Sequence, residues 1–160
     1  MYILGIMGFP GTLCHDGSAA ILKDGIVIAA AEQERFSRRK HAPGEAPYDA
    51  IKFCLEKAKL SLDDIDYIAN GWAEEKHMKM IPRGVESDYA KIIFPKTLFS
   101  YNEIPPIYFV KHHIAHIMSA YFQSGFKDAA CLVIDAQGES ESITLAKMTK
   151  DKLKILKTYD

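Results

Sequence analysis

Short apolar stretches separated by turn-forming residues divide the start of the chain into three predicted strands. These strands cover residues 3–7, 18–22 and 26–31. An Asp-Gly dipeptide at residues 24–25 separates the second strand from the third, and this dipeptide is a frequent hairpin turn. The pattern predicts a three-stranded antiparallel meander, whose first connection contains residues 14–17, Cys-His-Asp-Gly.

Two later stretches have apolar residues at helical spacing. Within residues 48–60, which follow a proline, Ile51, Leu55 and Ala58 form one apolar stripe and charged residues occupy the other side. Residues 114–124 form a second apolar stretch that a glycine ends. Both patterns predict helices.

The remaining pattern completes a mixed α/β arrangement. Residues 61–64 fit a capping box, and residues 71–106, which contain several prolines, predict only a helix or two. Further strands are predicted at residues 65–69, 108–110, 130–134, 142–148 and 153–159. We expect a mixed sheet with helices on its faces, in which residues 130–134 form a buried strand that ends at Asp135. The chain stops after a strand without a closing helix, which we interpret as truncation.

Composition places the chain among globular proteins of about one domain. It has 160 residues, of which 48% are hydrophobic and 26% charged, and its formal net charge is -1. This balance gives no general reason to expect nucleic acid as a partner, although residues 35–40 include a basic cluster. The apolar start is too short for a membrane helix and lacks a signal-peptide pattern, so no membrane partner is expected. Three widely spaced cysteines favour reduced thiols and a cytoplasmic location.

Three histidines lie within five positions at the start of the second predicted helix. His112 and His116 are four residues apart, so on a helix their side chains share one face and could bind one metal ion. The stretch reads HHIAH rather than HExxH, which disfavours metalloprotease chemistry. Asp135, at a strand end, is a candidate third ligand. His113 points about 100° away and is expected to pack or to support the ligand residues from behind. The alternative is that the pair is exposed or caps the helix.

Two acidic turns and one basic run are further candidates for binding. The turns HDGSA, residues 15–19, and DAQGE, residues 135–139, can expose backbone N–H groups to phosphate, or they can be ordinary hairpin turns. The run ERFSRRKH, residues 34–41, could clamp an anion or be solvated surface.

Two blocks of this sequence resemble a known enzyme family. The blocks HDGSAAILKDGIVIAAAEQERFSRRKH and HHIAHIMSAYFQSGFKDAACLVIDAQGES resemble the N-terminal part of the carbamoyltransferases of the nodulation-protein-U and cephamycin/tobramycin carbamoyltransferase family. The resemblance implies an actin-like ATPase fold (ASKHA, RNase H-like) that binds a divalent metal. Iron is the first expectation, with magnesium, manganese or zinc as alternatives. In the family, a YrdC-like domain makes carbamoyl-adenylate from carbamoyl phosphate and ATP, and the carbamoyl group passes to an acceptor hydroxyl.

The resemblance also implies roles for individual residues. Those expected to bind metal are His112, His116 and Asp135. Those expected at the acceptor hydroxyl are His15, as a candidate general base, and its neighbour Asp16. Those expected to line the nucleotide or face substrate are Gly138, Glu139, Arg39 and Lys40.

By this resemblance, residues 1–160 are the N-terminal lobe of a carbamoyltransferase domain. A further metal ligand and the YrdC-like domain would lie beyond residue 160, so the fragment alone is expected to be inactive. This chain also has Ala136 where the family commonly has glycine. Expected partners are a sugar or antibiotic acceptor and the rest of the polypeptide, and an exposed sheet edge could make the fragment self-associate.

Three other functions remain open from the sequence. A threonylcarbamoyl-transferase-like tRNA modification protein would share the metal pair, but it would need a broad basic surface. A non-catalytic metal- or nucleotide-binding lobe would serve only for interaction. A sugar kinase of the same fold class would leave the histidine pair without a role.

Overall fold

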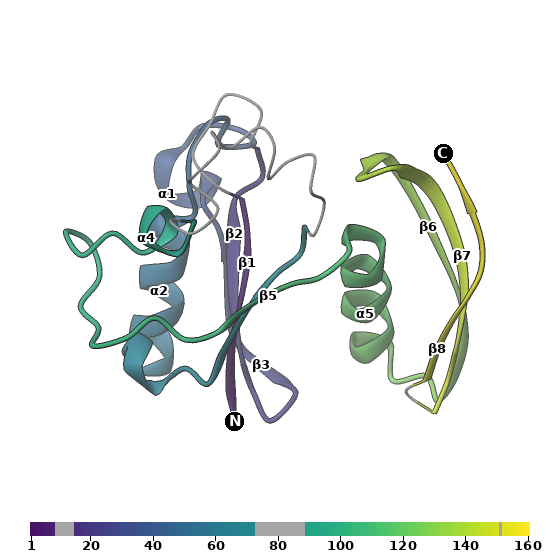
Figure 1. The fold of residues 1–160 in the computed structure, drawn as a ribbon, viewed down its shortest axis with the longest axis horizontal. Helices are drawn as coiled ribbons and strands as arrows, with labels where there is room; N and C mark the ends of the chain where they lie inside the picture. Colours follow the sequence, from purple (N-terminus) through teal and green to yellow (C-terminus); the bar gives the residue numbers. More distant parts are fainter. Residues whose placement is uncertain (9–14, 73–88, 151) are drawn as a thin grey trace. The chain divides into compact units, whose positions relative to one another are not determined.

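The computed structural model describes residues 1–8, 15–72, 89–150 and 152–160. The chain folds as two compact units (Figure 1). Among the described residues, the first unit contains Met1–Gly71 and the segment from the short helix α4 (Tyr89–Ile93) to Phe109. The second contains Trp72 and Val110–Asp160. Each unit has its own sheet and its own hydrophobic core. The boundary between them lies inside the lobe that the sequence analysis placed at residues 1–160.

A five-stranded mixed sheet forms the centre of the first unit, with the strand order β3-β2-β1-β4-β5. β1, β2 and β3 pair antiparallel, which confirms the predicted meander. β4 pairs parallel with β1, and β5 pairs parallel with β4. The strands are β1 Tyr2–Met7, β2 Ser18–Lys23, β3 Ile26–Glu32, β4 Tyr67–Asn70 and β5 Ile107–Phe109.

Helix α2, Tyr48–Ala58, packs on β2 and β3 through the predicted apolar stripe (Figure 1). Ile51 is fully buried in the core of this unit because that face of the helix meets the sheet. The first N–H groups of α2 are satisfied by a residue from outside the helix. The buried Gln33 side chain accepts hydrogen bonds through Oε1 from the backbone N–H of Asp49 at 3.0 Å and of Ala50 at 3.2 Å. Gln33 therefore ties the end of β3 to the start of α2.

Short helices connect the strands of the first unit. The helices are α1 Glu34–Ser37, the 3-10 helix η1 Leu62–Asp64 and α4 Tyr89–Ile93. The predicted capping box at η1 is confirmed, since the Asp64 carboxylate accepts from the backbone N–H and the hydroxyl of Ser61, both at 2.7 Å. These two hydrogen bonds lower the pKa of Asp64.

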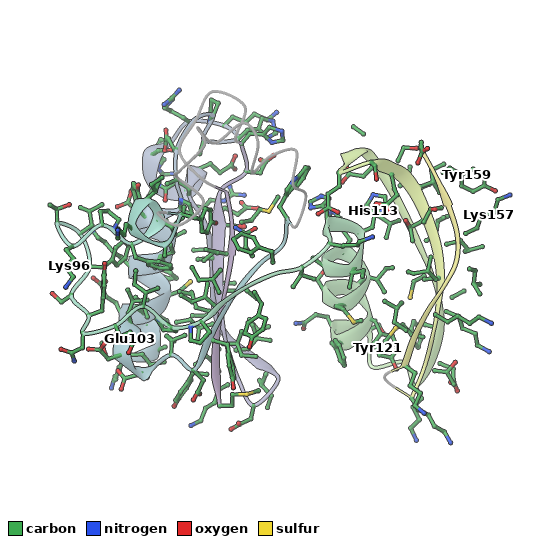
Figure 2. All side chains as sticks on the ribbon, in the orientation of Figure 1. Lys96, Glu103, His113, Tyr121, Lys157 and Tyr159 are labelled. Carbon is green, nitrogen blue, oxygen red and sulfur yellow. The ribbon has the colours of Figure 1, made fainter. Side chains whose placement is uncertain are left out.

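In the second unit one helix packs on a three-stranded antiparallel sheet, β6-β7-β8. Its elements are α5 His112–Ser124, β6 Asp128–Gly138, β7 Glu141–Thr149 and β8 Lys152–Tyr159. The core between α5 and the sheet contains Ile117, Tyr121 and Val133. Lys157 and Tyr159 project from β8 on the side of the sheet away from α5 (Figure 2).

Three predictions for this unit are corrected. Residues 130–134 are not a buried strand, because Leu132 is 62% and Ile134 73% exposed. The helix covers one face only, so alternate side chains of β6 face away from the core. Asp135 does not end the strand, since β6 continues to Gly138 and Asp135 lies where its register with β7 shifts. The last three strands form a separate sheet instead of joining the first.

Some predicted features lie outside the described residues. These are Cys14 and, within the poorly patterned stretch 71–106, residues 73–88. Among the described helices, none combines the length and apolar character needed to cross a membrane.

The two described cysteines differ in burial, and this predicts a difference in reactivity. Cys54 is fully buried, its thiol donates to the carbonyl of Ala19 at 3.4 Å, and burial raises the thiol pKa to about 11. Because the thiolate is the reactive form, we expect iodoacetamide at pH 8 to leave Cys54 unmodified in the folded protein. Peptide mass mapping measures this, with the partly buried Cys131 as the internal comparison. Modification of Cys54 as fast as in urea would contradict the burial.

Candidate metal centre

Helix α5 brings two imidazoles to one point in the second unit. It begins at His112 rather than at residue 114, so its first turn contains the residue that pairs with His116 one turn later. The Nε2 atoms of His112 and His116 lie 3.0 Å apart, and their ring centroids are 4.5 Å apart. The i, i+4 spacing therefore directs both Nε2 atoms into the same space.

The Asp135 carboxylate meets the same point from β6. Its Oδ2 atom lies 3.0 Å from Nε2 of His112 and 3.3 Å from Nε2 of His116. Asp135 reaches this position at the register shift of β6, since such irregularities re-aim a side chain. The structure thus brings all three predicted metal ligands together, with all ligand atoms within 4.8 Å of one another.

These contacts restrict the proton content of the cluster. Two unprotonated Nε2 atoms would set lone pair against lone pair at 3.0 Å, so a proton or a cation has to lie between them. Burial is the largest influence on His116 and lowers its pKa, and the charge of His112 lowers it further. Asp135 raises the pKa of His116, but this effect is smaller than the combined effect of burial and His112. His116 therefore favours the neutral imidazole, which is the form that binds metal.

Two further side chains contact His112. The ring of Trp72 lies against its imidazole with centroids 4.4 Å apart. The Oε1 atom of Glu139 accepts a hydrogen bond from the His112 backbone N–H at 3.3 Å, where an acidic group also complements the helix dipole. Glu139 was expected on the nucleotide side, and the structure places its carboxylate at the start of α5. Its nucleotide role stays a prediction.

His113 fixes α5 against the sheet. It is buried, as expected of a packing residue, and its Nδ1 atom lies 2.6 Å from Oγ1 of the buried Thr144 on β7. Its Nε2 atom is also buried and has no hydrogen-bond partner among the described residues. Gly138 packs so closely on this ring that a Cβ atom there would collide with Nε2 and Cδ2 of His113. Figure 2 shows His113 near the start of α5, the end that carries the cluster.

The close contact gives Gly138 a structural reason to be glycine. The sequence analysis expected it on the nucleotide side, and that role stays a prediction. The HHIAH motif indicated His113 only as a packing residue, and neither its contact with Gly138 nor that with Thr144 has a signal in the sequence.

A pocket of about 550 Å³ lies beside the cluster, between α5 and β6. His116 and Asp135 line it together with apolar residues that include Ile117 and Phe126. Two of the three candidate ligands are therefore open to a small molecule from this side.

The other predicted site residues lie in the first unit. Nδ1 of His15 lies 2.6 Å from Oδ2 of Asp16, and Oδ1 of the same carboxylate lies 2.8 Å from Nδ1 of His41. His41 was not singled out from the sequence, although it ends the basic run that carries the family resemblance. Arg39 pairs with Glu45 at 2.8 Å.

Lys40 is exposed at the surface of the first unit. Arg39 and Lys40 were expected to face substrate, and that role stays a prediction.

Comparisons with known proteins identify the family and the fold of this chain. The sequence model of the carbamoyltransferase N-terminus family matches residues 3–92. Nodulation protein NolNO of Sinorhizobium fredii is 37% identical over an alignment that covers 96% of this chain and 24% of that protein. The uncharacterized protein sll1178 of Synechocystis sp. is 33% identical, over 90% of this chain and 27% of that protein. The chain thus spans about a quarter of the length of these curated relatives.

Among solved structures, YeaZ from Pseudomonas aeruginosa is similar in fold. Its TM-score is 0.50 with 15% sequence identity, over 98% of this chain and 64% of that one. YeaZ has the actin-like ATPase fold, so this likeness confirms the predicted fold class.

The contact between Gly138 and His113 predicts a large effect for one added methyl group. We expect Gly138→Ala to destabilise the second unit by about 1–3 kcal/mol, because the methyl group would force the ring and β6 apart. Native-state hydrogen exchange of the β6 and β7 amides measures this. Gly5→Ala is the matched control, since the nearest atom to its new Cβ would be the Ala20 carbonyl oxygen at 3.8 Å.

A second variant tests the cause of that effect. In His113→Ala/Gly138→Ala the collision is absent, so the double variant should lose less stability than the sum of the two single changes. Additive losses would show that the ring contact is not what excludes a side chain at residue 138.

Proposed function

Since this chain belongs to the carbamoyltransferase N-terminus family, we propose that it provides the metal-binding and acceptor-activating residues of an ATP-dependent O-carbamoyltransferase. The single observation that carries this proposal is the convergence of Nε2 of His112, Nε2 of His116 and Oδ2 of Asp135 at 3.0–3.3 Å. The rest of the enzyme would be supplied by sequence beyond these 160 residues.

The donor set fits a divalent transition metal. Two imidazole nitrogens and one carboxylate oxygen are the ligands that Fe(II) prefers in open sites, and they also suit zinc or manganese. Burial lowers the pKa of His116 and so favours its neutral, metal-binding form. We propose iron as the first choice and magnesium as the least suited, because magnesium favours oxygen ligands. When bound, the metal would act as a Lewis acid that neutralises charge on a phosphate.

The chain's own residues would hold the metal and activate the acceptor. His112 and Asp135 would hold it from α5 and β6, and the Glu139 carboxylate would keep the first turn of α5 in place. His15 would take the proton of the acceptor hydroxyl through Nε2 while the hydroxyl oxygen attacks the carbonyl carbon of carbamoyl-adenylate. The bond from that carbon to the adenylate phosphate oxygen breaks, so the products are a carbamate ester and AMP.

The co-substrates and partners follow from this reaction. ATP and carbamoyl phosphate would supply the carbamoyl-adenylate, and a small molecule with a hydroxyl group, a sugar or an antibiotic, would accept the carbamoyl group. The partner of this chain would be the remainder of its own polypeptide, and the location would be the cytoplasm, where ATP is available. Neither nucleic acid nor a membrane has a part in this reaction.

The histidine pair separates the two half-reactions. In the full-length protein, His112→Ala with His116→Ala should reduce carbamoyl transfer by about 100-fold or more, because two of the metal ligands are lost. Formation of carbamoyl-adenylate, measured as pyrophosphate release from ATP, should stay within about two-fold since it belongs to another domain. The probe acceptor is whichever sugar or amino sugar the unaltered protein carbamoylates. Equal loss of both half-reactions would count against the assignment.

Metal binding can be tested on this chain alone. We expect Co²⁺ added without oxygen to bind at one equivalent to the cluster and to give d–d absorption in the visible range. Asp135→Asn should weaken binding by about 10–100-fold because a charged ligand is replaced by a neutral one. Asp24→Asn, which removes an exposed carboxylate of the first unit, is the matched control. The same absorption and affinity in Asp135→Asn would place the metal elsewhere.

A further inference from the structure

In the first unit, one carboxylate joins two imidazoles. The Oδ2 atom of Asp16 contacts Nδ1 of His15 at 2.6 Å, and its Oδ1 atom contacts Nδ1 of His41 at 2.8 Å. His41 lies 25 residues after Asp16 in the sequence, so the fold and not the local chain creates the second contact. Both oxygens of the carboxylate are thereby used by histidines.

The chemistry of a carboxylate determines which nitrogen of each ring carries the proton. An ionised carboxylate only accepts hydrogen bonds, so each Nδ1 atom facing Asp16 has to donate an N–H. A neutral imidazole has one N–H, which leaves Nε2 of both rings as a bare acceptor. Desolvation, the largest influence on Asp16, raises its pKa, but the hydrogen bonds and the electrostatic attraction of His41 and His15 together outweigh it, and the pKa lies below the ordinary value. Asp16 is therefore ionised at neutral pH.

The backbone holds His41 firmly in this position. Its N–H donates to Oε2 of Glu34 at 2.6 Å, and its carbonyl oxygen accepts from the N–H of Asp16 at 2.7 Å. Asp16 and His41 both adopt the left-handed backbone region, with φ of 56° and 64°. This region is uncommon for residues other than glycine, and Asp and His are among the residue types that adopt it most readily.

Nearby arginines do not compete for Asp16. Arg35 contacts Glu32 at 2.6 Å, and Arg39 contacts Glu45 at 2.8 Å. Each of these cations is paired with a glutamate, which leaves the Asp16 carboxylate to the two histidines.

We propose that His41 is a positioning residue, which acts through Asp16 to hold His15 with Nε2 unprotonated and ready to accept the proton of an acceptor hydroxyl. The inference rests on the proposed function, because it takes His15 as the general base. It adds a residue that the sequence pattern did not single out. One oxygen of Asp16 contacts His41, which favours one orientation of the carboxylate, and the other oxygen favours the Nδ1–H tautomer of the His15 ring.

The proton positions can be tested on this chain without any activity. Long-range ¹H–¹⁵N NMR spectra at pH 8 distinguish Nδ1–H from Nε2–H imidazoles. We expect the Nδ1–H form for both His15 and His41, and for both a return to the mixture seen in free histidine in Asp16→Asn. Asp24→Asn should leave both spectra unchanged. An Nε2–H form at His15, or no response to Asp16→Asn, would overturn the proposal.

Variants of the full-length protein then test the positioning role. The side-chain amide of asparagine can replace the Nδ1–H donor of histidine but offers nothing equivalent to Nε2. His41→Ala should therefore lower the transfer rate by about 10-fold, and His41→Asn should restore it to within about two-fold of the unaltered protein. His15→Asn should lose about 100-fold or more because the base itself is gone. An amide ¹H–¹⁵N spectrum that is unchanged away from the substituted residue checks that each variant of this chain is folded.

The outcomes separate this inference from the proposed function. The positioning role would be wrong if His41→Asn lost as much of the transfer rate as His41→Ala, or if His41→Ala lost none. Either result would leave the role of His15 as the base intact. If His15→Asn keeps the full transfer rate, both the positioning role of His41 and the role of His15 as the base are wrong.

Discussion

The candidate metal centre depends on the packing of the first turn of α5 against the ends of β6 and β7. Three ligand atoms meet at 3.0–3.3 Å only if helix and strand keep one relative position. His113 maintains that position, because its ring fits between Thr144 and the Cβ-free surface of Gly138. A buried Nε2 atom without a partner among the described residues is a cost of this arrangement. The ring that packs and the ring that binds are neighbours in the sequence, so fixing His113 also fixes His112.

The periodic pattern of the sequence predicted the elements of the first unit well. Short apolar stretches, the Asp-Gly turn and the apolar stripe of α2 are local signals, and each lies where the structure has the corresponding element. The pattern failed for residues 130–134, which are apolar on both faces of β6. Composition cannot tell a strand covered on both faces from one covered on a single face, so the exposure of Leu132 and Ile134 required the structure.

For the candidate site, spacing along a helix was informative and contacts between distant segments were not. The i, i+4 pair of His112 and His116 could be predicted because the helix itself sets the geometry. The contact of Thr144 with His113 and that of His41 with Asp16 join residues far apart in the chain, so no local sequence pattern predicts them. Asp135 was predicted as a ligand for the wrong local reason, since it lies at a register shift within β6 and not at a strand end.

Each unit combines histidines with one aspartate, and the nitrogen that faces the carboxylate differs. At Asp135 the two Nε2 atoms point inward, so their lone pairs and the carboxylate share a space of the size that a cation needs. At Asp16 the two Nδ1 atoms point inward, so their protons are used by the carboxylate and the Nε2 atoms remain available to other groups. The same residue types thus favour metal binding in one unit and proton acceptance in the other. The surrounding structure differs as well: a regular helix brings Nε2 of His112 and His116 to one point, whereas the rings of His15 and His41 meet Asp16 in connecting segments, where Asp16 and His41 have a left-handed backbone.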